Sequence, residues 1–489
     1  MFKTFVPDTQ TILQQLRDYE SRNVTLIEPD GSWPIVWDRA RGVNVWDADG
    51  RKYLDLTAAF GVAAVGHANP RVVRAGQRQM ARLLHAMGDV HPHALKAQLA
   101  RQLSRLTFER WAGVAGGKGG GAKEVCASSN RQGLAKVFSG RQDAALHGRP
   151  GCLPLQTGKT IFANSGFEAV EAALKTALLA TGKPGVIAFE GAYHGLGYGA
   201  LNATHRDHFR QQFEFQLGQF GHFAPFPNDG DRAGWARTEA ALRRLFRRQK
   251  IGAVLVEPIQ TRGGINVPPP EFLPGLRALC DEQGALLVLD EIYTGFGRTG
   301  SWFACEHSRT VPDLICLGKA LTGGFPLSAC VGRADLMDAA WPASTGEAIH
   351  TSTFLGHPVG CAMALAQIAE IERLALPARA ADLGKFLLAE LAKIQIPQSK
   401  AVCQSRGRGL LVGMELNLPD GKPATQLALG AVKTLLHRGY IFLPEGEHAN
   451  VISFTPPLTI TRPQLARAVA ALAQALAVSP EISSGDPKK

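Results

Sequence analysis

Two acidic residues and a lysine follow two successive apolar runs, and together they could do carbonyl chemistry. The run 285-ALLVLDEIYTGFGRTG places Asp290 and Glu291 after an apolar segment, and 313-DLICLGKALTGGFPLSACVG places Lys319 after the next one. A lysine held among apolar residues is pushed toward its neutral, nucleophilic form, because burial disfavours the charge. Each run alone also fits a simpler role. Asp290 could be a helix cap or a metal ligand, and Lys319 a surface lysine whose stem packs on apolar neighbours.

A third run could bind an anion. In 161-IFANSGFEAVEAALKTA an apolar segment turns through Asn164, Ser165 and Gly166 directly into an amphipathic helical pattern. A helix start presents free N–H groups and the positive end of the helix dipole, although the same pattern also fits an ordinary helix cap. An amine, a carboxylate and an anion site together match what pyridoxal phosphate requires of a protein.

Alternating strands and helices must position these groups. Between residues 158 and 332, short apolar runs such as 251-IGAVLVEP alternate with helical patterns, which lie at 167–180, 236–249 and 271–283. This alternation predicts an α/β fold in which helices cover both faces of a mostly parallel sheet. Functional groups in such sheets gather at the carboxyl ends of the strands, and all three chemical runs follow that rule.

The two ends of the chain are expected to form a smaller α+β domain. A helix is predicted at 8–20, a β-hairpin between 35 and 56, helical structure at 361–396, and strands near 409, 440 and 451. The predicted division is an N-terminal segment at 1–75 belonging to the small domain, a large cofactor-binding domain at 76–360, a C-terminal small domain at 361–478 and a tail at 479–489.

Residues 108–156 interrupt this order, because they contain ten glycines and seven basic residues against three acidic ones. We expect a surface insertion there, either disordered or acting as a lid or a contact to a second subunit.

Composition excludes several other classes of function. The net charge of +11 is spread along the chain rather than gathered in a basic helix or finger, so no nucleic-acid partner is expected. No apolar run reaches the roughly 18 residues of a membrane span, and the first twenty residues lack a secretory signal pattern. Eight scattered cysteines form no Cys-x-x-Cys pair, so no metal site is expected. A cytoplasmic protein follows as the expectation.

The three runs resemble the class III aminotransferases, the ornithine, 4-aminobutyrate and acetylornithine group of the fold-type-I pyridoxal-phosphate enzymes. The resemblance covers about residues 30–105 and 158–475, and its most specific part is DEIYTGFGRTG followed by Lys319. It implies that Lys319 holds the cofactor as a Schiff base and moves the substrate proton, and that Asp290 pairs with the ring nitrogen. Ile292 and Tyr193 would pack on the two ring faces. The phosphate would lie at Ser165, Gly166 and Phe167.

Other roles implied by the resemblance lie further along the chain. Thr353 would reach the phosphate of a neighbouring subunit, which implies a homodimer, with a tetramer left open. Glu257 resembles a buried glutamate near the cofactor, and Arg406 resembles an arginine that binds a substrate carboxylate. The pattern departs at Tyr293, where the family commonly has a cofactor-bonding Gln, and at Arg262, where many members carry a glutamate. Tyr293 can still donate a hydrogen bond, and Arg262 would favour an anionic group on the substrate.

The expected function is a transaminase that moves an amino group from an amino donor to a 2-oxo acid in two half-reactions. The same family contains an aminomutase, racemases and a decarboxylating transaminase, and the residues do not separate these reactions. A non-catalytic scaffold that kept the fold is a further alternative.

Overall fold

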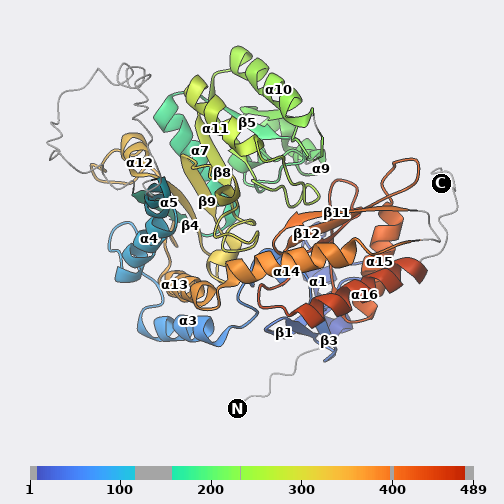
Figure 1. Cartoon of the computed structure of the whole chain (residues 1–489). Helices are drawn as coiled ribbons and strands as arrows, with labels where there is room; N and C mark the ends of the chain where they lie inside the picture. Colours follow the sequence, from blue (N-terminus) through green and yellow to red (C-terminus); the bar gives the residue numbers. More distant parts are fainter. Residues whose placement is uncertain (1–7, 116–156, 229, 232, 397–400, 479–489) are drawn as a thin grey trace.

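A seven-stranded sheet forms the centre of the molecule (Figure 1). The computed structural model describes residues 8–115, 157–228, 230–231, 233–396 and 401–478. The strand order is β4-β10-β9-β8-β7-β5-β6. The strands from β9 to β6 run parallel, whereas β10 is antiparallel to both of its neighbours. The prediction of a mostly parallel sheet is therefore confirmed. The strands are β4 (Gly158–Ala163), β5 (Gly185–Phe189), β6 (Gly221–Ala224), β7 (Ile251–Val256), β8 (Leu286–Asp290), β9 (Leu314–Leu317) and β10 (Ser328–Arg333).

Helices cover both faces of this sheet, as the alternating pattern predicted. Side chains alternate between the two faces along a strand. Val288 packs in a cluster with helix α7 (Gly166–Thr181) and helix α12 (Ala334–Ala340). Leu287 and Leu289 belong to the other cluster, which includes α10 (Gly234–Arg248) and α11 (Phe272–Gln283). Since both faces are buried, the inner strands β7 and β9 are apolar along their whole length rather than alternating.

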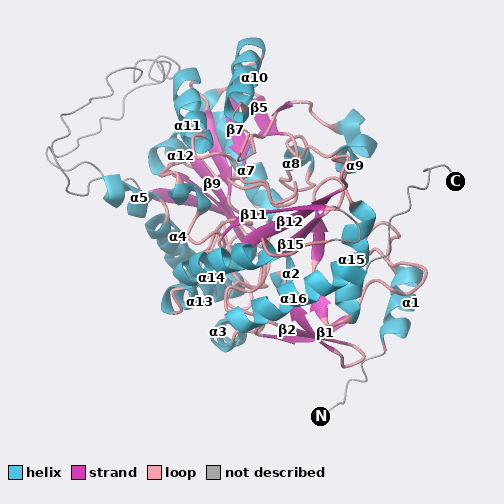
Figure 2. Ribbon diagram, turned by 45° about the vertical axis from the view of Figure 1, so that its right-hand side comes forward, coloured by secondary structure: helices cyan, strands magenta, loops and turns pink. Residues whose placement is uncertain are grey.

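Two four-stranded sheets lie beside the large one (Figure 2). The first joins the two ends of the chain, because β13 near the C-terminus pairs in parallel with β3 near the N-terminus. The predicted hairpin between 35 and 56 is therefore part of a larger sheet. Its strands are β1 (Trp37–Arg41), β2 (Asn44–Asp47), β3 (Lys52–Asp55) and β13 (Tyr440–Ile441). The second sheet has the order β11 (Val402–Arg408), β12 (Leu411–Asn417), β15 (Val451–Phe454) and β14 (Leu443–Glu445).

Some elements differ from the sequence predictions. The helical segment at 361–396 is two helices, α13 (Pro358–Arg373) and α14 (Leu376–Leu391), separated at Ala375, whose φ of 46° is left-handed. Strand β11 was not predicted, because its polar sequence VCQSRGR lacks an apolar run. The insertion predicted at 108–156 begins as helix α5 (Phe108–Ala115), and its residues 116–156 lie outside the described residues.

The remaining helices complete the layers around the three sheets. None of the described helices combines the length and the apolarity of a membrane span. The division into domains at 75, 360 and 478 stays a prediction. The remaining helices are α1 (Thr9–Tyr19), α2 (Ala58–Gly61), α3 (Pro70–Arg82), α4 (Ala94–Leu106), α8 (Tyr198–Leu201), α9 (Asp207–Arg210), α15 (Thr425–His437) and α16 (Arg462–Val478), with short 3-10 turns at Gln211–Gln216, Ala304–His307 and Lys319–Leu321.

Candidate active site

A cavity of about 420 Å³ lies near the carboxyl ends of the parallel strands. It holds Lys319 and Asp290, the lysine and the acid singled out from the sequence. A second cavity, of about 480 Å³, is described below. Asp290 is the last residue of β8, and Lys319 follows β9 after one glycine. Neighbouring parallel strands end at the same edge of a sheet, which brings these two groups together. The volume lies within the roughly 300–1,000 Å³ typical of ligand pockets. We call the 420 Å³ space the lysine cavity.

Lys319 occupies a strained position at the floor of the lysine cavity. Its φ is 37°, in the left-handed region that a residue with a side chain rarely adopts. Its Nζ lies 4.5 Å from the centre of the Tyr293 ring. Burial lowers the pKa of the Lys319 amine, and the positive charge of Arg262 lowers it further, whereas Asp290 and Glu257 act in the opposite direction. The net lowering favours the neutral amine that carbonyl chemistry requires.

Asp290 is held from two sides. One carboxylate oxygen, Oδ2, lies 2.7 Å from Nδ1 of His194, and the other accepts the backbone N–H of Ile292 at 3.1 Å. The His194 side chain is fully buried, and its backbone N–H donates to Thr204 Oγ1 at 2.9 Å. His194 Nε2 has no hydrogen-bond partner among the described residues. His194 was not predicted from the sequence, where its adjacency to Tyr193 was the one available signal.

The neighbouring acid Glu291 has a structural role. Its carboxylate accepts hydrogen bonds from the Thr294 hydroxyl at 2.6 Å and from the backbone N–H groups of Ala304 and Cys305, both at 2.8 Å. Burial raises the pKa of Glu291 to about 7, although these donors pull the value down. Of the two acids after β8, only Asp290 lines the lysine cavity.

The predicted phosphate site lies at the start of α7. Ser165 is the N-cap residue of this helix, but its side chain makes no capping hydrogen bond. Gly166 and Phe167 line the lysine cavity. A Cβ at Gly166 would lie 3.0 Å from Cδ1 of Ile292, so the glycine lets the helix start approach the floor closely. The first-turn carboxylate of Glu168 is turned away to accept the backbone N–H of Asn164 at 2.8 Å.

Three further predicted residues surround the same cavity. Tyr193 and Ile292 both line it. Glu257 is buried, and its carboxylate accepts the backbone N–H groups of Tyr193 at 3.0 Å and Thr261 at 3.2 Å. Burial raises the pKa of Glu257 to about 7, against an opposing effect of His194. Glu257 therefore ties together the two loops that carry Tyr193 and Arg262.

Tyr293 contributes its ring to the cavity rather than its hydroxyl. The hydroxyl lies 3.2 Å from Oγ1 of Thr455, which itself donates to the backbone carbonyl of Thr57. A Cβ at Gly61, whose φ is +80°, would lie 2.7 Å from the Tyr293 ring, so only glycine fits against it. The Tyr293 hydroxyl is therefore bonded within the protein, and its expected hydrogen bond to the cofactor stays a prediction.

Arg262 stands at the mouth of the cavity, as part of a charged cluster. Its Nε lies 3.6 Å from Oε2 of Glu445, which is only 2% exposed. Burial raises the pKa of Glu445 to about 7, and the nearby cations Arg262, Lys319 and Arg206 oppose this rise. Glu445 and Arg206 were not predicted, because neither belongs to a recognisable motif. We call Arg206, Arg262 and Glu445 the mouth cluster.

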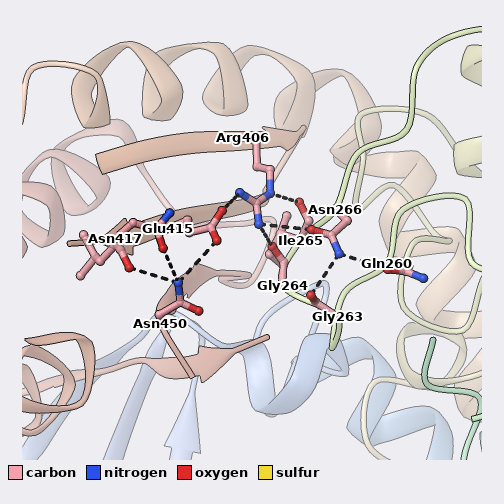
Figure 3. Close-up of polar contacts among 10 residues, drawn as sticks. Gln260, Gly263, Gly264, Ile265, Asn266, Arg406, Glu415, Asn417 and Asn450 are labelled. Carbon is pink, nitrogen blue, oxygen red and sulfur yellow. Dashed lines mark hydrogen bonds and ion pairs between the residues drawn. The ribbon is translucent and has the colours of Figure 1, made fainter. Parts of the chain in front are cut away.

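Arg406 does not line the lysine cavity, and its expected role in binding a substrate carboxylate stays a prediction. It lines the separate cavity of about 480 Å³ between β11, β12 and the loops near 263 and 447. Its guanidinium makes four hydrogen bonds to protein groups, shown in Figure 3. The sequence pattern singled out the arginine but could not show which cavity its side chain lines.

Thr353 also lies away from the cavity of its own chain. It is exposed in the loop that precedes α13. The expected role of Thr353 at the phosphate of a neighbouring subunit stays a prediction.

Comparison with known proteins identifies a family for most of the chain. The family model described as aminotransferase class-III matches residues 27–127 and 151–476. An acetylornithine aminotransferase of Methanosarcina mazei is 33% identical over 445 residues, which cover 91% of this chain and 92% of that protein. A 5-aminovalerate aminotransferase of Pseudomonas aeruginosa is 35% identical over 449 residues, which cover 90% of this chain and 93% of that protein.

The fold is also similar to a solved structure that contains the expected cofactor. An amine transaminase from an uncultivated Pseudomonas species, in its pyridoxal-phosphate-bound form, matches with a TM-score of 0.77 and 27% identity. The match covers 94% of this chain and 98% of that one. The residues that the family model leaves out within its matched span, 128–150, fall inside the glycine-rich insertion.

Proposed function

This chain belongs to the class III aminotransferases and is a pyridoxal-phosphate-dependent transaminase of fold type I, and from this we propose that its reaction takes place in the lysine cavity. The observation that carries the proposal is the half-buried Lys319 on the same cavity as Asp290 and the uncapped start of α7. Members of this family take amino donors and oxo acids as substrates. Their common reaction needs a protein amine that holds the cofactor and a base that acts at the reacting carbon.

The residues around the cavity fit pyridoxal phosphate. The start of α7 offers backbone N–H groups and a positive dipole end for the phosphate. Asp290 offers a buried carboxylate for the ring nitrogen, and Ile292 and Tyr193 offer apolar surface for the ring. When bound, the cofactor supplies a carbonyl carbon and a ring that takes up electrons from the substrate.

Within this arrangement, Lys319 has two tasks. Its neutral amine holds the cofactor, and after an amino donor displaces it, the same amine moves a proton at the amine-bearing carbon of the donor. A lowered pKa suits the second task, because a base acts best when its pKa lies near the working pH. Asp290 keeps the ring nitrogen protonated, and His194 holds the Asp290 carboxylate in one orientation from 2.7 Å.

The mouth cluster supports a substrate that carries a carboxylate. Acetylornithine and 5-aminovalerate, which the names of the two relatives contain, both carry one. Arg262 lines the cavity that holds Lys319, and its partner Glu445 is held at 3.6 Å rather than in a short bidentate pair. A guanidinium binds carboxylates well through paired N–H groups. We propose that Arg262 binds the carboxylate of the substrate.

The experiment that tests the proposed site compares the purified holoenzyme with Lys319→Ala. Addition of 5-aminovalerate should shift the cofactor absorbance from its carbonyl form to its amine form and release an oxo acid in the wild type, but not in the variant. Omission of the oxo-acid acceptor should stop turnover after one half-reaction. Continued turnover without the acceptor would instead indicate an aminomutase or a racemase, and release of carbon dioxide would indicate a decarboxylating transaminase.

We further propose a homodimer that shares its active sites. Helix α3 and the segment after it expose Met80, Leu84, Met87 and Val90, between 46% and 60% each. Contiguous exposed apolar groups of this kind mark interaction surfaces. The same segment contacts the loop that carries Thr353, because His85 stacks edge-on with Phe354 at 5.3 Å and Thr351 bonds Asp89.

A mixing experiment tests this dimer. Subunits carrying Lys319→Ala and subunits carrying Thr353→Ala are each expected to be impaired. Unfolding and refolding them together should restore activity, because half of the sites in mixed dimers then hold neither substitution. Absence of restoration, with dimers seen by light scattering, would contradict the shared site.

A further inference from the structure

Two histidines cap helices that meet the loop carrying Thr353. His93 is the N-cap residue of α4, and its Nδ1 accepts the backbone N–H of Lys96 at 3.3 Å. His357 is the N-cap residue of α13, and its Nδ1 accepts the backbone N–H of Val359 at 3.2 Å. The usual capping side chains are hydroxyls, amides and carboxylates, and this chain uses them elsewhere, at Asp8, Thr57 and Asn69. Unlike these, an imidazole cap can take up a proton near neutral pH.

The loop of residues 351–357, which we call the Thr353 loop, is bonded directly to one of these rings. Nε2 of His93 lies 2.7 Å from the backbone carbonyl oxygen of Gly356. The side chain of Lys96 packs on the same glycine, where an added Cβ would lie 3.1 Å from the lysine Cδ. The Lys96 Nζ also donates to the carbonyl of Gly88 at 2.6 Å. The start of α4 therefore holds the end of the Thr353 loop.

The second ring stands at the end of the Thr353 loop itself. His357 is the last residue of the loop, and its ring centre lies 5.9 Å from that of His85 and 6.1 Å from that of Phe354. Phe354 is next to Thr353 in the chain. The ring that caps α13 therefore also packs against the neighbour of Thr353.

Both caps require neutral imidazoles. A backbone N–H can only donate, so Nδ1 of His93 carries no proton, and its Nε2–H donates to the Gly356 carbonyl. Nδ1 of His357 is an acceptor for the same reason. A protonated imidazole is a donor at both nitrogens, and its charge would lie at the positive end of the helix dipole. Protonation therefore removes both caps.

Burial favours the neutral ring of His357. It lowers the pKa of this ring from the usual 6.5, and His85 and His93 lower it further. The folded loop therefore binds fewer protons than the unfolded one. Its order is complete above about pH 6.5 and is lost as the pH falls through the lower value of the folded protein.

The other titratable groups around the two caps come from α4, α13 and the segment before α4. They are Lys96, Cys361 and Asp89. Lys96 carries a positive charge that opposes protonation of either ring. Cys361 stays neutral, because burial raises the pKa of its thiol to about 12. The Asp89 carboxylate accepts the hydroxyl of Thr351, which lies in the Thr353 loop. The histidines are therefore the groups that change charge between pH 5.5 and 7.5.

We propose that His93 and His357 are positioning residues, which hold Thr353 in place for the cofactor phosphate of the neighbouring subunit only while both rings are neutral. The inference rests on the proposed shared active site and deepens it. It makes the cofactor affinity of one subunit depend on the protonation of two histidines in the other.

The test compares the wild type with His357→Asn, whose side chain can cap the helix and carries no charge at any pH. The dissociation constant of pyridoxal phosphate is measured by equilibrium dialysis of each protein at pH 7.5 and at pH 5.5. The ratio of the two constants cancels pH effects that both proteins share, such as those of Lys319. We expect agreement within about twofold at pH 7.5. At pH 5.5 the wild type should bind roughly 3- to 10-fold more weakly, the range for losing one cap.

Hydrogen exchange measured by mass spectrometry gives a second readout that needs no turnover. After correction for the intrinsic rate, a peptide covering 349–361 should exchange faster at pH 5.5 in the wild type than in His357→Asn. His357→Ala has no cap, so it should exchange fast and bind the cofactor weakly at both pH values. His91→Asn is the matched control, because His93 and not the exposed His91 caps α4, and it should follow the wild type.

His93→Asn serves as the second variant where His357→Ala folds poorly. It keeps a capping oxygen for the N–H of Lys96 but removes the ring nitrogen that bonds Gly356. Exchange in the Thr353 loop should therefore be fast at both pH values. Exchange as slow as in the wild type at pH 7.5 would show that the His93 bond does not hold the loop, and would contradict the inference.

Thr353→Ala separates this inference from the shared active site. If this substitution leaves the cofactor affinity unchanged, the shared site is wrong and the inference falls with it. If it weakens binding, but the wild type and His357→Asn keep the same ratio at both pH values, the shared site stands and this inference alone is wrong. Faster exchange at pH 5.5 without weaker cofactor binding would also overturn it, because the caps would then hold the loop without acting on the cofactor.

Discussion

The floor of the lysine cavity and its mouth are held by different kinds of element. At the floor, Asp290 and Lys319 follow adjacent parallel strands, and the register of β8 and β9 places them together. At the mouth, Arg262 lies on a strained turn and Glu445 ends a strand of another sheet. The floor is therefore set by short-range strand geometry, whereas the mouth depends on how a second sheet packs against a loop. Substitutions at the floor should change the chemistry, and those at the mouth should change the choice of substrate.

The largest effect should come from Lys319→Ala at the floor. Loss of both the cofactor-holding amine and the base should lower kcat by roughly 10³-fold or more for every donor. Turnover and cofactor content of the purified protein measure this. Lys159→Ala is the control, because Lys159 is an exposed lysine that pairs with Asp338 at the surface, and it should retain nearly full activity. If the loss of kcat in Lys319→Ala differed between donors, the assignment of the chemistry to the floor and of substrate choice to the mouth would be wrong.

His194→Phe should have the next largest effect, again on the chemistry. It removes the partner that lies 2.7 Å from the buried Asp290 carboxylate, and an unsatisfied buried acceptor costs about 1–3 kcal/mol. We expect kcat to fall roughly 10- to 100-fold for carboxylate and uncharged donors alike. The pH dependence of the cofactor absorbance should also shift, and His194→Gln, which keeps a donor, should recover part of both. A change in substrate ratio instead of kcat would contradict the assignment of His194 to the floor.

At the mouth, Glu445→Gln should remove a pH dependence of KM that the wild type shows. Burial raises the pKa of Glu445 to about 7, with a contribution from Glu257, although Arg262, Lys319 and Arg206 oppose the rise. Above about pH 7 its carboxylate is charged and competes with the substrate for Arg262. Below that pH it is neutral and competes less. KM for 5-aminovalerate, divided by that for an uncharged amine, should therefore rise several-fold through pH 7 in the wild type.

The same ratio should stay flat in Glu445→Gln, whose side chain is neutral at every pH. Steady-state kinetics between pH 6 and 8.5 measure both proteins. An equal rise in the two proteins would show that another group causes it, and no rise in either would remove Glu445 from substrate selection.

The smallest effect concerns stability, at an acid outside both regions. Burial raises the pKa of Glu291 from 4.5 to about 7 in the folded protein. Between these values the folded state holds a proton that the unfolded state has lost, so this contribution to stability falls as pH rises from about 4.5 to about 7. The slope is at most about 1.4 kcal/mol per pH unit for one proton. Glu291→Gln should flatten the pH dependence of the unfolding free energy in this window and leave substrate ratios unchanged.

The local patterns of the chain were sufficient for Asp290 and Lys319 at the floor. An apolar strand followed by Asp290 and the next followed by Lys319 specify where parallel strands end, and parallel strands end together. The apolar run and helical pattern around Ser165 likewise specified the start of α7. The fold class and the cofactor followed from these runs, because buried strands and helix starts are encoded by neighbouring residues.

The mouth, and the partners of Asp290 and Tyr293, required contacts between segments far apart in the chain. No local pattern shows that Glu445 meets Arg262, that His194 faces Asp290, or that the Tyr293 hydroxyl bonds Thr455. Arg406 was expected to bind a substrate carboxylate because its motif resembles that of the family's arginine, but the motif could not show that its guanidinium donates to Asn266, 140 residues away in the chain. Residue type sets which partners a side chain can bind. Which of them lies within hydrogen-bond distance depends on the packing of β11 and β12 against the 260–266 turn.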